Sequence, residues 1–467
     1  MVRLLLVVVP LAVLAGCKTE NPAFCADVTN AGMQGCPDAG PPGGTCTQNT
    51  DCKMMGFPVC NTDKGMCAQC LATEPKNSCP STAPHCDVDS CTACVDDTDC
   101  PSSVCMLDGS CADPAKVIHV LVNGQDQAPC GGTGVGNACK LDVALAVAAT
   151  DGTKNVIKVD DSGTYMSGMN NFVVNANVTI DLNGATLVKH MDGPPIVIIS
   201  SGKQVTLLGG TIMGAKGAMG SAIACSGGAT LNVDQTLLTM NDQFGIDANA
   251  CTLTVTRAKI EHNMATGVKA NGGSLTLVRS WLDNNDGGGV DVNTNARFTI
   301  VGNVVVSNGA GGGIFGGISV ATTVANNRLE FNSIAENKAQ MLAPAGISCN
   351  ANAGFVAKNN IVWNNNSAVP NMAGIQVSGI CGHSYSDIGP AAITGPIDIG
   401  NNQHIDPKFK DNTTDLHLTS TSPLQMLQQS DPGTSLNDPK DPAVKDIDGE
   451  PRISPADIGA DQYPPKP

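Results

Sequence analysis

The fold is decided by two neighbouring stretches that share one pattern, GIDANACTLTVTRAKIEHN at residues 245–263 and GVKANGGSLTLVRSWLDNN at residues 267–285. Each stretch opens with Gly followed by Ile or Val, alternates apolar with polar residues, and closes on Asn. The second stretch begins 22 residues after the first. A unit of this length cannot bury its apolar face alone, so its recurrence predicts a stack of repeats that share one core.

Two ladders of residues extend this pattern along the chain. In the first ladder a small residue precedes Ile or Val, at Ala222-Ile223, Gly245-Ile246, Gly267-Val268, Gly289-Val290, Gly313-Ile314, Gly346-Ile347 and Gly374-Ile375. In the second ladder an apolar residue stands three positions before Asn, in the pairs Leu238 and Asn241, Ile260 and Asn263, Leu282 and Asn285, Val305 and Asn308, Leu329 and Asn332, and Val362 and Asn365. The last two steps of the first ladder lengthen to 33 and 28 residues, which predicts loops that bulge on one side.

A parallel β-helix satisfies this periodicity. Each coil would make two or three short strands, and alternation within the strands would send Ile, Val and Leu inward. The 52 glycines and the Asn residues suit tight turns, because both accept a left-handed backbone, and stacked Asn amides can bond to one another. A β-propeller would need blades of about 40 residues and a leucine-rich horseshoe its own Leu pattern, so both are excluded.

The two ends of the repeat region resemble known proteins. Predicted strands at residues 117–122, 156–159, 163–165, 178–180 and 184–187, with a predicted helix over residues 140–149, resemble the opening of pectin-lyase-like right-handed β-helix proteins. The closing segments DIDGEPR (446–452) and DIGA (457–460) resemble the end of bacterial β-helix proteins with a choice-of-anchor Q domain. The resemblance implies an all-β fold class, a right-handed parallel β-helix (solenoid) over residues 115–411, and a C-terminal cap segment over residues 412–467.

The first seventeen residues have the features of a lipoprotein signal peptide. Arg3 supplies a positive charge, an apolar stretch runs from Leu4 to Leu14, and the segment is short for a bilayer span. The sequence LAGC at residues 14–17 resembles the lipobox of bacterial lipoproteins, which implies cleavage before Cys17 and acylation of that residue. Several acyl chains would give a stable membrane anchor, and Lys18 favours the outer membrane. The alternative is an ordinary secretory signal with an incidental Cys.

The remaining twenty cysteines predict a disulfide framework in an exported protein. Fourteen of them lie between Cys25 and Cys111, and three units of four begin at residues 46, 70 and 94. We expect two bridges in each unit and a separate Cys25–Cys36 pair in a stalk over residues 18–114, where bridges replace a core. Zinc held by the C-x-x-C pairs is the alternative. Later pairs are predicted, against buried free thiols, between Cys130 and Cys139, Cys225 and Cys251, and Cys349 and Cys381.

Composition bears on the class of ligand. The net charge of −16 would repel a polyanion, and aromatic residues make up only 3% of the chain. Both features argue against nucleic-acid binding, and the second also argues against a sugar cleft paved with Trp and Tyr. The two Trp residues, Trp281 and Trp363, are expected to face outward, either as a sugar platform or simply exposed.

One set of outward positions suggests chemistry. The resemblance implies enzymes that cleave or epimerise acidic polysaccharides with Asp-bound calcium and an Arg or Lys base, but no position here matches such a motif residue by residue. Positions two past each small residue put Asp247, Lys269 and Asp291 on successive coils. The two carboxylates could bind Ca²⁺, and Lys269 could act as a catalytic base or as a clamp on a uronate. The alternative is a charge-paired surface ladder.

These observations predict an outer-membrane or cell-surface lipoprotein that displays a parallel β-helix for glycan binding or adhesion. The expected partners are the membrane, through the lipid anchor, and a polysaccharide. The alternatives are a polysaccharide lyase or epimerase acting on acidic glycans and an envelope-structural protein without a specific ligand.

Overall fold

The computed structural model describes residues 45–463, apart from residues 53–56, 72–78, 88, 168–170, 190, 311–312, 352–353, 370–372, 392, 394–395 and 424–428. The predicted signal peptide, the predicted lipid-anchor residue Cys17 and the predicted Cys25–Cys36 pair lie outside the described residues. The chain divides into two compact units, Met1–Pro114 and Ala115–Pro467. No helix among the described residues is long and apolar enough to cross a membrane.

The described part of the first unit is a series of small disulfide-bonded modules. Two antiparallel pairs supply its strands, β1 (Val59–Asn61) with β2 (Met66–Ala68) and β3 (His85–Asp87) with β4 (Ser90–Thr92). Each unit of four cysteines joins its first Cys to its third and its second to its fourth: Cys46–Cys60, Cys52–Cys67, Cys70–Cys86, Cys79–Cys91, Cys94–Cys105 and Cys100–Cys111. All twelve sulfurs are therefore in bridges, which leaves none of them as a thiolate for zinc.

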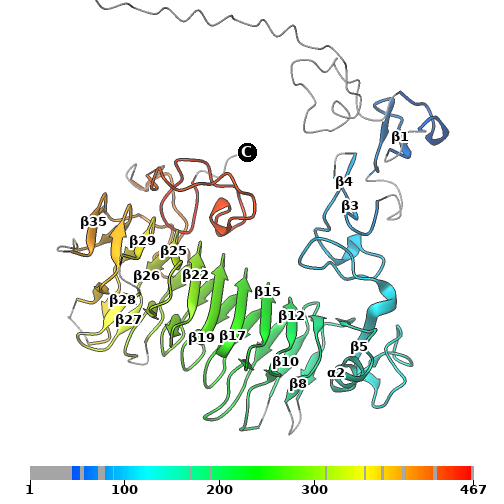
Figure 1. The fold of residues 1–467 in the computed structure, drawn as a ribbon, viewed down its shortest axis with the longest axis horizontal. Coiled ribbons are helices and arrows are strands. Elements are labelled where there is room, and N and C mark those ends of the chain that lie inside the picture. Colours follow the sequence, from blue (N-terminus) through cyan, green and yellow to red (C-terminus); the bar gives the residue numbers. More distant parts are fainter. Residues whose placement is uncertain are drawn as a thin grey trace, which may run out of the picture. The chain divides into compact units, whose positions relative to one another are not determined.

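The second unit is a parallel β-helix, so the predicted fold class is confirmed. Each complete coil contributes three strand positions, which we call A, B and C in chain order. A and B strands form one 19-stranded sheet and C strands form a 10-stranded sheet. Figure 1 shows the coils of this unit stacked one upon the next. The A strands are β8 (Phe172–Val174), β11 (Val197–Ile199), β14 (Ile223–Ser226), β21 (Val290–Asn293), β24 (Ile318–Ala321), β28 (Pro344–Asn350) and β32 (Ile375–Gly379), while β17 (Ile246–Thr256) and β19 (Val268–Val278) span positions A and B.

The other strands complete the coils. The B strands are β5 (Val117–Gln125), β6 (Val156–Val159), β9 (Val178–Asp181), β12 (Gln204–Leu208), β15 (Thr230–Asp234), β22 (Arg297–Val301), β25 (Arg328–Glu330), β29 (Val356–Lys358), β33 (Gly382–Ser384) and β35 (Asp398–Gly400). The C strands are β7 (Thr164–Met166), β10 (Thr186–Val188), β13 (Thr211–Met213), β16 (Leu237–Thr239), β18 (Lys259–Glu261), β20 (Trp281–Asp283), β23 (Val304–Val306), β26 (Ser333–Ala335), β30 (Ile361–Trp363) and β34 (Asp387–Gly389). A short pair, β27 (Lys338–Ala339) with β31 (Asn366–Ser367), joins two later loops.

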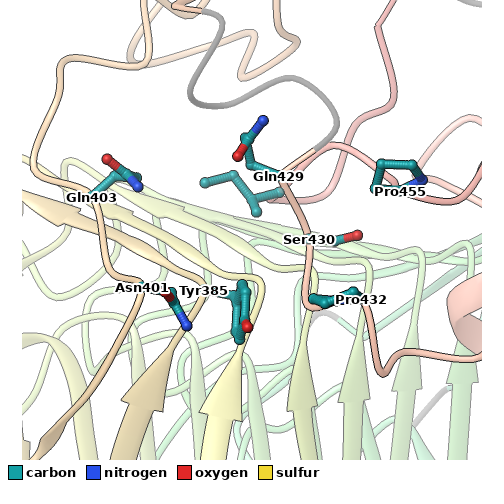
Figure 2. A pocket seen from close by; sticks show the side chains of 8 residues that line it. Tyr385, Asn401, Gln403, Gln429, Ser430, Pro432 and Pro455 are labelled. Atoms are coloured by element: carbon teal, nitrogen blue, oxygen red, sulfur yellow. The ribbon is translucent and has the colours of Figure 1, made fainter.

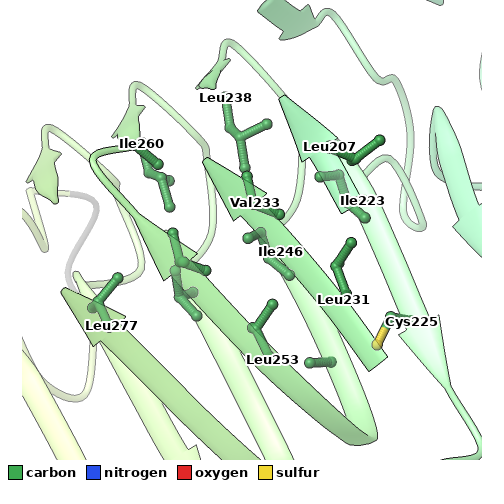
Figure 3. Packing of buried hydrophobic residues seen from close by; sticks show 14 of the residues in the cluster. Leu207, Ile223, Cys225, Leu231, Val233, Leu238, Ile246, Leu253, Ile260 and Leu277 are labelled. Atoms are coloured by element: carbon green, nitrogen blue, oxygen red, sulfur yellow. The ribbon is translucent and has the colours of Figure 1, made fainter. Parts of the chain in front are cut away.

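The core lies inside the coils and is built by alternation along the strands. Figure 3 shows Ile223, Ile246, Leu231 and Leu253 among the inward residues stacked coil upon coil, and all four are buried. Helix α2 (Leu141–Thr150) packs against β5, β6 and β8 and extends this core at its first coils. Cys130 is bridged to Cys139 within the loop that precedes α2. The bridges Cys225–Cys251 and Cys349–Cys381 each join two successive coils.

The first ladder was placed wrongly at two late coils. Val290 pairs with Ile318, so Gly317-Ile318 continues the ladder, whereas Ile314 is 76% exposed in the preceding loop. At the last coil Ile347 pairs with Val377 after a register shift, so Ile375 is also displaced from the ladder. The physical reason is that the inserted residues lie before the strand, and counting from a Gly in a Gly-rich loop selects the wrong Gly.

The asparagine ladder exists, but its order differs from the prediction. Buried amides bond in series from Asn241 through Asn263, Asn285, Asn308 and Asn337 to Asn365, at Nδ2 to Oδ1 distances of 2.8, 2.8, 2.9, 2.9 and 2.8 Å. Asn332 belongs instead to a second ladder that runs through Ser280, Asn303, Asn332, Asn360, Ser386 and Asn402.

The left-handed backbone does not fall on the ladder residues themselves. In both ladders a residue with positive φ directly precedes the ladder residue, as at His262 (φ 53°) and Asn284 (φ 49°). The sharp corner made there turns the following amide into the interior, where it bonds to the coil on either side. Asn does accept the left-handed backbone at several of these corners, as at Asn284, Asn359 and Asn364, whereas the ladder residues themselves directly follow the corners.

A C-terminal segment without regular strands covers the outer side of several C strands. Trp363, Val304 and Val306 form an apolar cluster with Leu416, Leu418, Ile458 and Ala460. Arg328 pairs with Asp441 at 2.9 Å, and the buried guanidinium of Arg452 stacks on the Phe331 ring at 4.5 Å. Trp363 is only 9% exposed, and Trp281 packs against the same cluster, so neither is an open sugar platform.

Candidate ligand-binding face

The predicted stack of charged residues forms on the outer side of strands β17, β19 and β21. Asp247 pairs in register with Lys269, and Lys269 pairs with Asp291. Ile246 and Ala248 on either side of Asp247 are buried, so alternation directs the side chain of Asp247 away from the core. The same alternation applies along β19 and β21, and the three polar side chains are each half-buried.

Lys269 contacts only part of this stack. Its Nζ lies 3.9 Å from Asp247 Oδ1 and 4.5 Å from the centre of the Phe244 ring. The ammonium therefore contacts Asp247 and the face of the Phe244 ring, and attraction to the ring quadrupole adds to the ion pair. Held between a carboxylate and an aromatic face, the Nζ atom is placed to clamp an anionic group.

Asp291 is held by different partners. Burial raises the pKa of this carboxyl above its usual range, while hydrogen bonds from Asn293 and Ser319 and the charge of Lys269 oppose that rise. Ser319 stands next to Asp291 on the following coil. The column therefore continues into Ser319, Ser348 and Ser378. Counting two positions past Gly313, Gly346 and Gly374 of the first ladder instead gives Phe315, Ser348 and Gln376. Phe315 is buried in the loop, and Gln376 instead closes the asparagine ladder at Asn365.

A column of amides runs beside the charged column. Asn249 pairs with Asn271, and Asn271 pairs with Asn293, two positions along each strand from the charged residues. Asn249 is exposed, and the other two are half-buried. The face thus offers donors and acceptors at the strand spacing of about 4.8 Å. It can bind hydroxyl and carboxylate groups along an extended chain.

The residues of the stack fit a calcium ion poorly. Asp247 and Asp291 stand two coils apart, about 9–10 Å between their backbones, and the chain of Lys269 lies between them. Calcium takes six to eight oxygen ligands at about 2.3–2.6 Å, and two carboxylates separated in this way do not supply such a shell. Calcium binding by Asp247 and Asp291 stays a prediction that a titration can test.

Two buried titratable groups on the last coils were not anticipated. Burial lowers the pKa of His383 to about 4, and its Nδ1 has no partner among the described residues. Burial also raises the pKa of Asp387 to about 7, although its Oδ1 accepts a hydrogen bond from the Ile405 N–H. Both side chains are buried, apart from the outer column of Asp247, Lys269 and Asp291. The spacing of residues in the sequence did not indicate that either group would be buried.

A separate cavity of about 290 Å³ opens where the last coils meet the C-terminal segment (Figure 2). Its lining contains no charged side chain and consists of Tyr385, Asn401, Gln403, Gln429, Ser430, Pro432, Pro455 and Ile458. This hollow offers hydrogen bonds but no acid–base pair, so it does not add a catalytic group to the polar face.

Comparison with known proteins supplies a fold neighbour. No family model matches the chain, and no curated protein matches it. Among solved structures it is similar to the crystal structure of pectate lyase Pel9A, with a TM-score of 0.46 and 13% identity over 74% of this chain and 95% of that chain. At this level the likeness assigns no reaction. The fold and the bridges define a parallel β-helix protein with an N-terminal disulfide-rich region.

Proposed function

We propose that this protein is a lipid-anchored protein of the outer membrane or cell surface whose β-helix binds acidic glycans. The observation that carries the proposal is the column of Asp247, Lys269 and Asp291 beside the amides of Asn249 and Asn271 on one solvent-facing side of the sheet. The ammonium of Lys269 would take one uronate carboxylate and offset, at this position, the repulsion expected from the net charge of −16. The amides would bond to ring hydroxyls.

Two further features support the surface location. Nine disulfides among the described residues fit an oxidising compartment outside the cytoplasm. The LAGC sequence at residues 14–17 would supply the lipid anchor at Cys17. Along the chain, the disulfide-rich region over residues 18–114 follows this anchor residue and precedes the β-helix.

Binding of oligogalacturonate to the mature protein, measured by calorimetry with and without calcium, tests the proposal. Lys269→Ala should weaken binding at least about tenfold, the scale of one lost charge-assisted hydrogen bond. Lys259→Ala is a matched control, because Lys259 also pairs with an acid, Glu261 at 2.6 Å, but lies on a C strand. Equal binding by wild type and Lys269→Ala would refute the assignment of the face.

The alternative function, a lyase, predicts different results for the same protein and glycan. If Lys269 were a base in a lyase, wild type would generate unsaturated uronate products, and Lys269→Arg would stop product formation while sparing binding. A clamp keeps its charge in Lys269→Arg, and no product accumulates with either protein. Product formation abolished by this substitution would replace the binding function with a lyase function.

A further inference from the structure

A second group of polar side chains lies on the outer side of the C strands, apart from the column of Asp247, Lys269 and Asp291. Thr239, Glu261 and Asp283 stand next to one another in register on β16, β18 and β20. His262 follows Glu261 at the left-handed corner. One ligand atom from each of Glu261, His262 and Asp283 lies within 4.8 Å of the other two. Two carboxylates and an imidazole thus converge on one point of the surface.

An independent observation concerns Thr239. Its side chain is on the same outer side as Glu261, because Leu238 beside it points into the core and is fully buried. Thr239 is only 4% exposed, and its Oγ1 has no hydrogen-bond partner among the described residues. An unpartnered buried hydroxyl is costly. An ion held by Glu261 on the next coil, with a water that reaches Thr239, would remove that cost.

We infer that Glu261, His262 and Asp283 bind a divalent transition-metal ion of the zinc class, with the Thr239 hydroxyl beside it. Imidazole nitrogen favours such ions over calcium or magnesium, and carboxylate oxygen is compatible with them. Zinc bonds to these atoms are about 2.0–2.2 Å long, so ligand atoms around a tetrahedral ion stand about 3.5 Å apart. The three ligand atoms lie within 4.8 Å of one another, so side-chain rotations that shorten their separations by about 1 Å would bring them to that spacing. Three protein ligands leave the fourth position open to solvent or to an anion.

Two charged neighbours affect binding of the ion: Lys259, which the ion must displace from Glu261, and Glu261, whose charge repels Asp283. Lys259 Nζ lies 2.6 Å from Glu261 Oε2, but its side chain is half exposed and can swing into water. Asp283 has its pKa raised, first by burial and then by the neighbouring charge of Glu261, with Lys259 opposing. A divalent cation between the two carboxylates would cancel that repulsion. Lys259 therefore acts as a competitor of the metal.

Calorimetric titration of the untagged, chelator-treated full-length protein with zinc chloride tests the site, because a polyhistidine tag would bind the same ion. Wild type should show one saturable site. His262→Asn should weaken it at least about tenfold, since loss of even an outer-shell partner costs that much. Asn is chosen because Asn284 and Asn364 occupy the equivalent corner on other coils with the same positive φ. Asp283→Asn should have a similar effect.

Two more variants make the result decisive. Lys259→Gln removes the competing ammonium and should tighten zinc binding, an outcome that damage to the fold would not produce. His417→Asn disrupts another His and Asp cluster, formed with Asp448 and Asp461, and should leave the titration unchanged. His417 already bonds to Asp448 at 2.9 Å and to Asp415. The site is overturned if wild type shows no saturable binding, if His262→Asn binds as tightly as wild type, or if only His417→Asn loses the ion.

Discussion

Replacement of Asn308 by Ala tests whether the buried amide ladder holds the coils together. Asn308 Oδ1 accepts from the backbone N–H of Asn285 at 3.0 Å and from its Nδ2 at 2.9 Å. Asn308 Nδ2 donates to Asn337 Oδ1 at 2.9 Å and to the carbonyls of Leu282 and Val306, each at 3.0 Å. The residue is fully buried, so water cannot replace these partners without entering the core.

The expected loss follows from which groups remain without a partner. In the variant the Asn285 side chain keeps its bond to the Ile260 carbonyl, but the Asn285 backbone N–H loses its ladder acceptor. An orphaned buried donor costs about 1–3 kcal/mol, and each further lost hydrogen bond costs about 1 kcal/mol. Besides the orphaned donor, the variant loses the bond from Asn285 Nδ2 and the two bonds that the Nδ2 protons of Asn308 can make among three acceptors. We expect Asn308→Ala to lower the free energy of unfolding by about 4–6 kcal/mol.

Guanidinium unfolding followed by tryptophan fluorescence measures this loss cleanly. The chain has two Trp residues, Trp281 and Trp363, and both lie in the β-helix, so the signal reports on that unit alone. Asn271→Ala is the matched control, because Asn271 is on the outer face and should change stability by less than about 0.5 kcal/mol. A loss in Asn308→Ala no larger than that of the control would show that the ladder adds nothing to stability.

Four other outcomes are expected. Burial raises the pKa of Asp387 to about 7, so its stabilising contribution is present below pH 3.8 and is lost as pH rises through about 7. Asp387→Asn should therefore gain about 4 kcal/mol in urea unfolding at pH 8. His383 acts oppositely: its contribution is present above pH 6.5 and lost as pH falls through about 4, so a melting profile of His383→Gln should flatten over that range. Trp363→Ala should cost about 3–5 kcal/mol and speed proteolysis of the C-terminal segment. Cys17→Ala should move the protein from membrane to soluble fractions, and retention in the membrane would exclude the anchor.

The regular coils were predictable because their period is constant. From Ile223 to Val290 each ladder position is set by a step of 22 or 23 residues, and the structure pairs those positions as counted. Because one register places every residue of a strand, the stack of Asp247, Lys269 and Asp291 followed from the same count. Inward alternation then required no further assumption.

Prediction failed where an insertion changed the phase. A step of 24 residues from Asn308 leads to Asn332, which is near the normal coil length, but the true partner is Asn337 at a step of 29. Both residues are Asn and both are buried in ladders, so composition could not separate them. Only the pairing of Val305 with Ile334 fixes which one continues the series.

The burial of the two tryptophans could not be predicted from the sequence repeat, for a different reason. The C-terminal segment that buries Trp363 has no repeat, and its contacts, such as the Ala460 N–H to Ser333 Oγ at 3.0 Å, span more than a hundred residues of chain. Alternation could say that Trp363 points away from the coil interior. It could not say that another segment would lie on top of it.

The repeated corner shows where this fold leaves room for function. The residue before each ladder amide must adopt positive φ, yet its side chain points outward and is free to vary, and the series runs Met240, His262, Asn284, Ser307, Glu336 and Asn364. Gly would be the conformationally cheapest choice at every one of these corners, so each side chain present costs some backbone strain. Solubility explains a polar residue at a corner but does not favour His over Asn. The position of His262 beside Glu261 and Asp283 favours His, because an imidazole there completes a set of metal ligands. Among the described residues, no other corner of this series belongs to such a set.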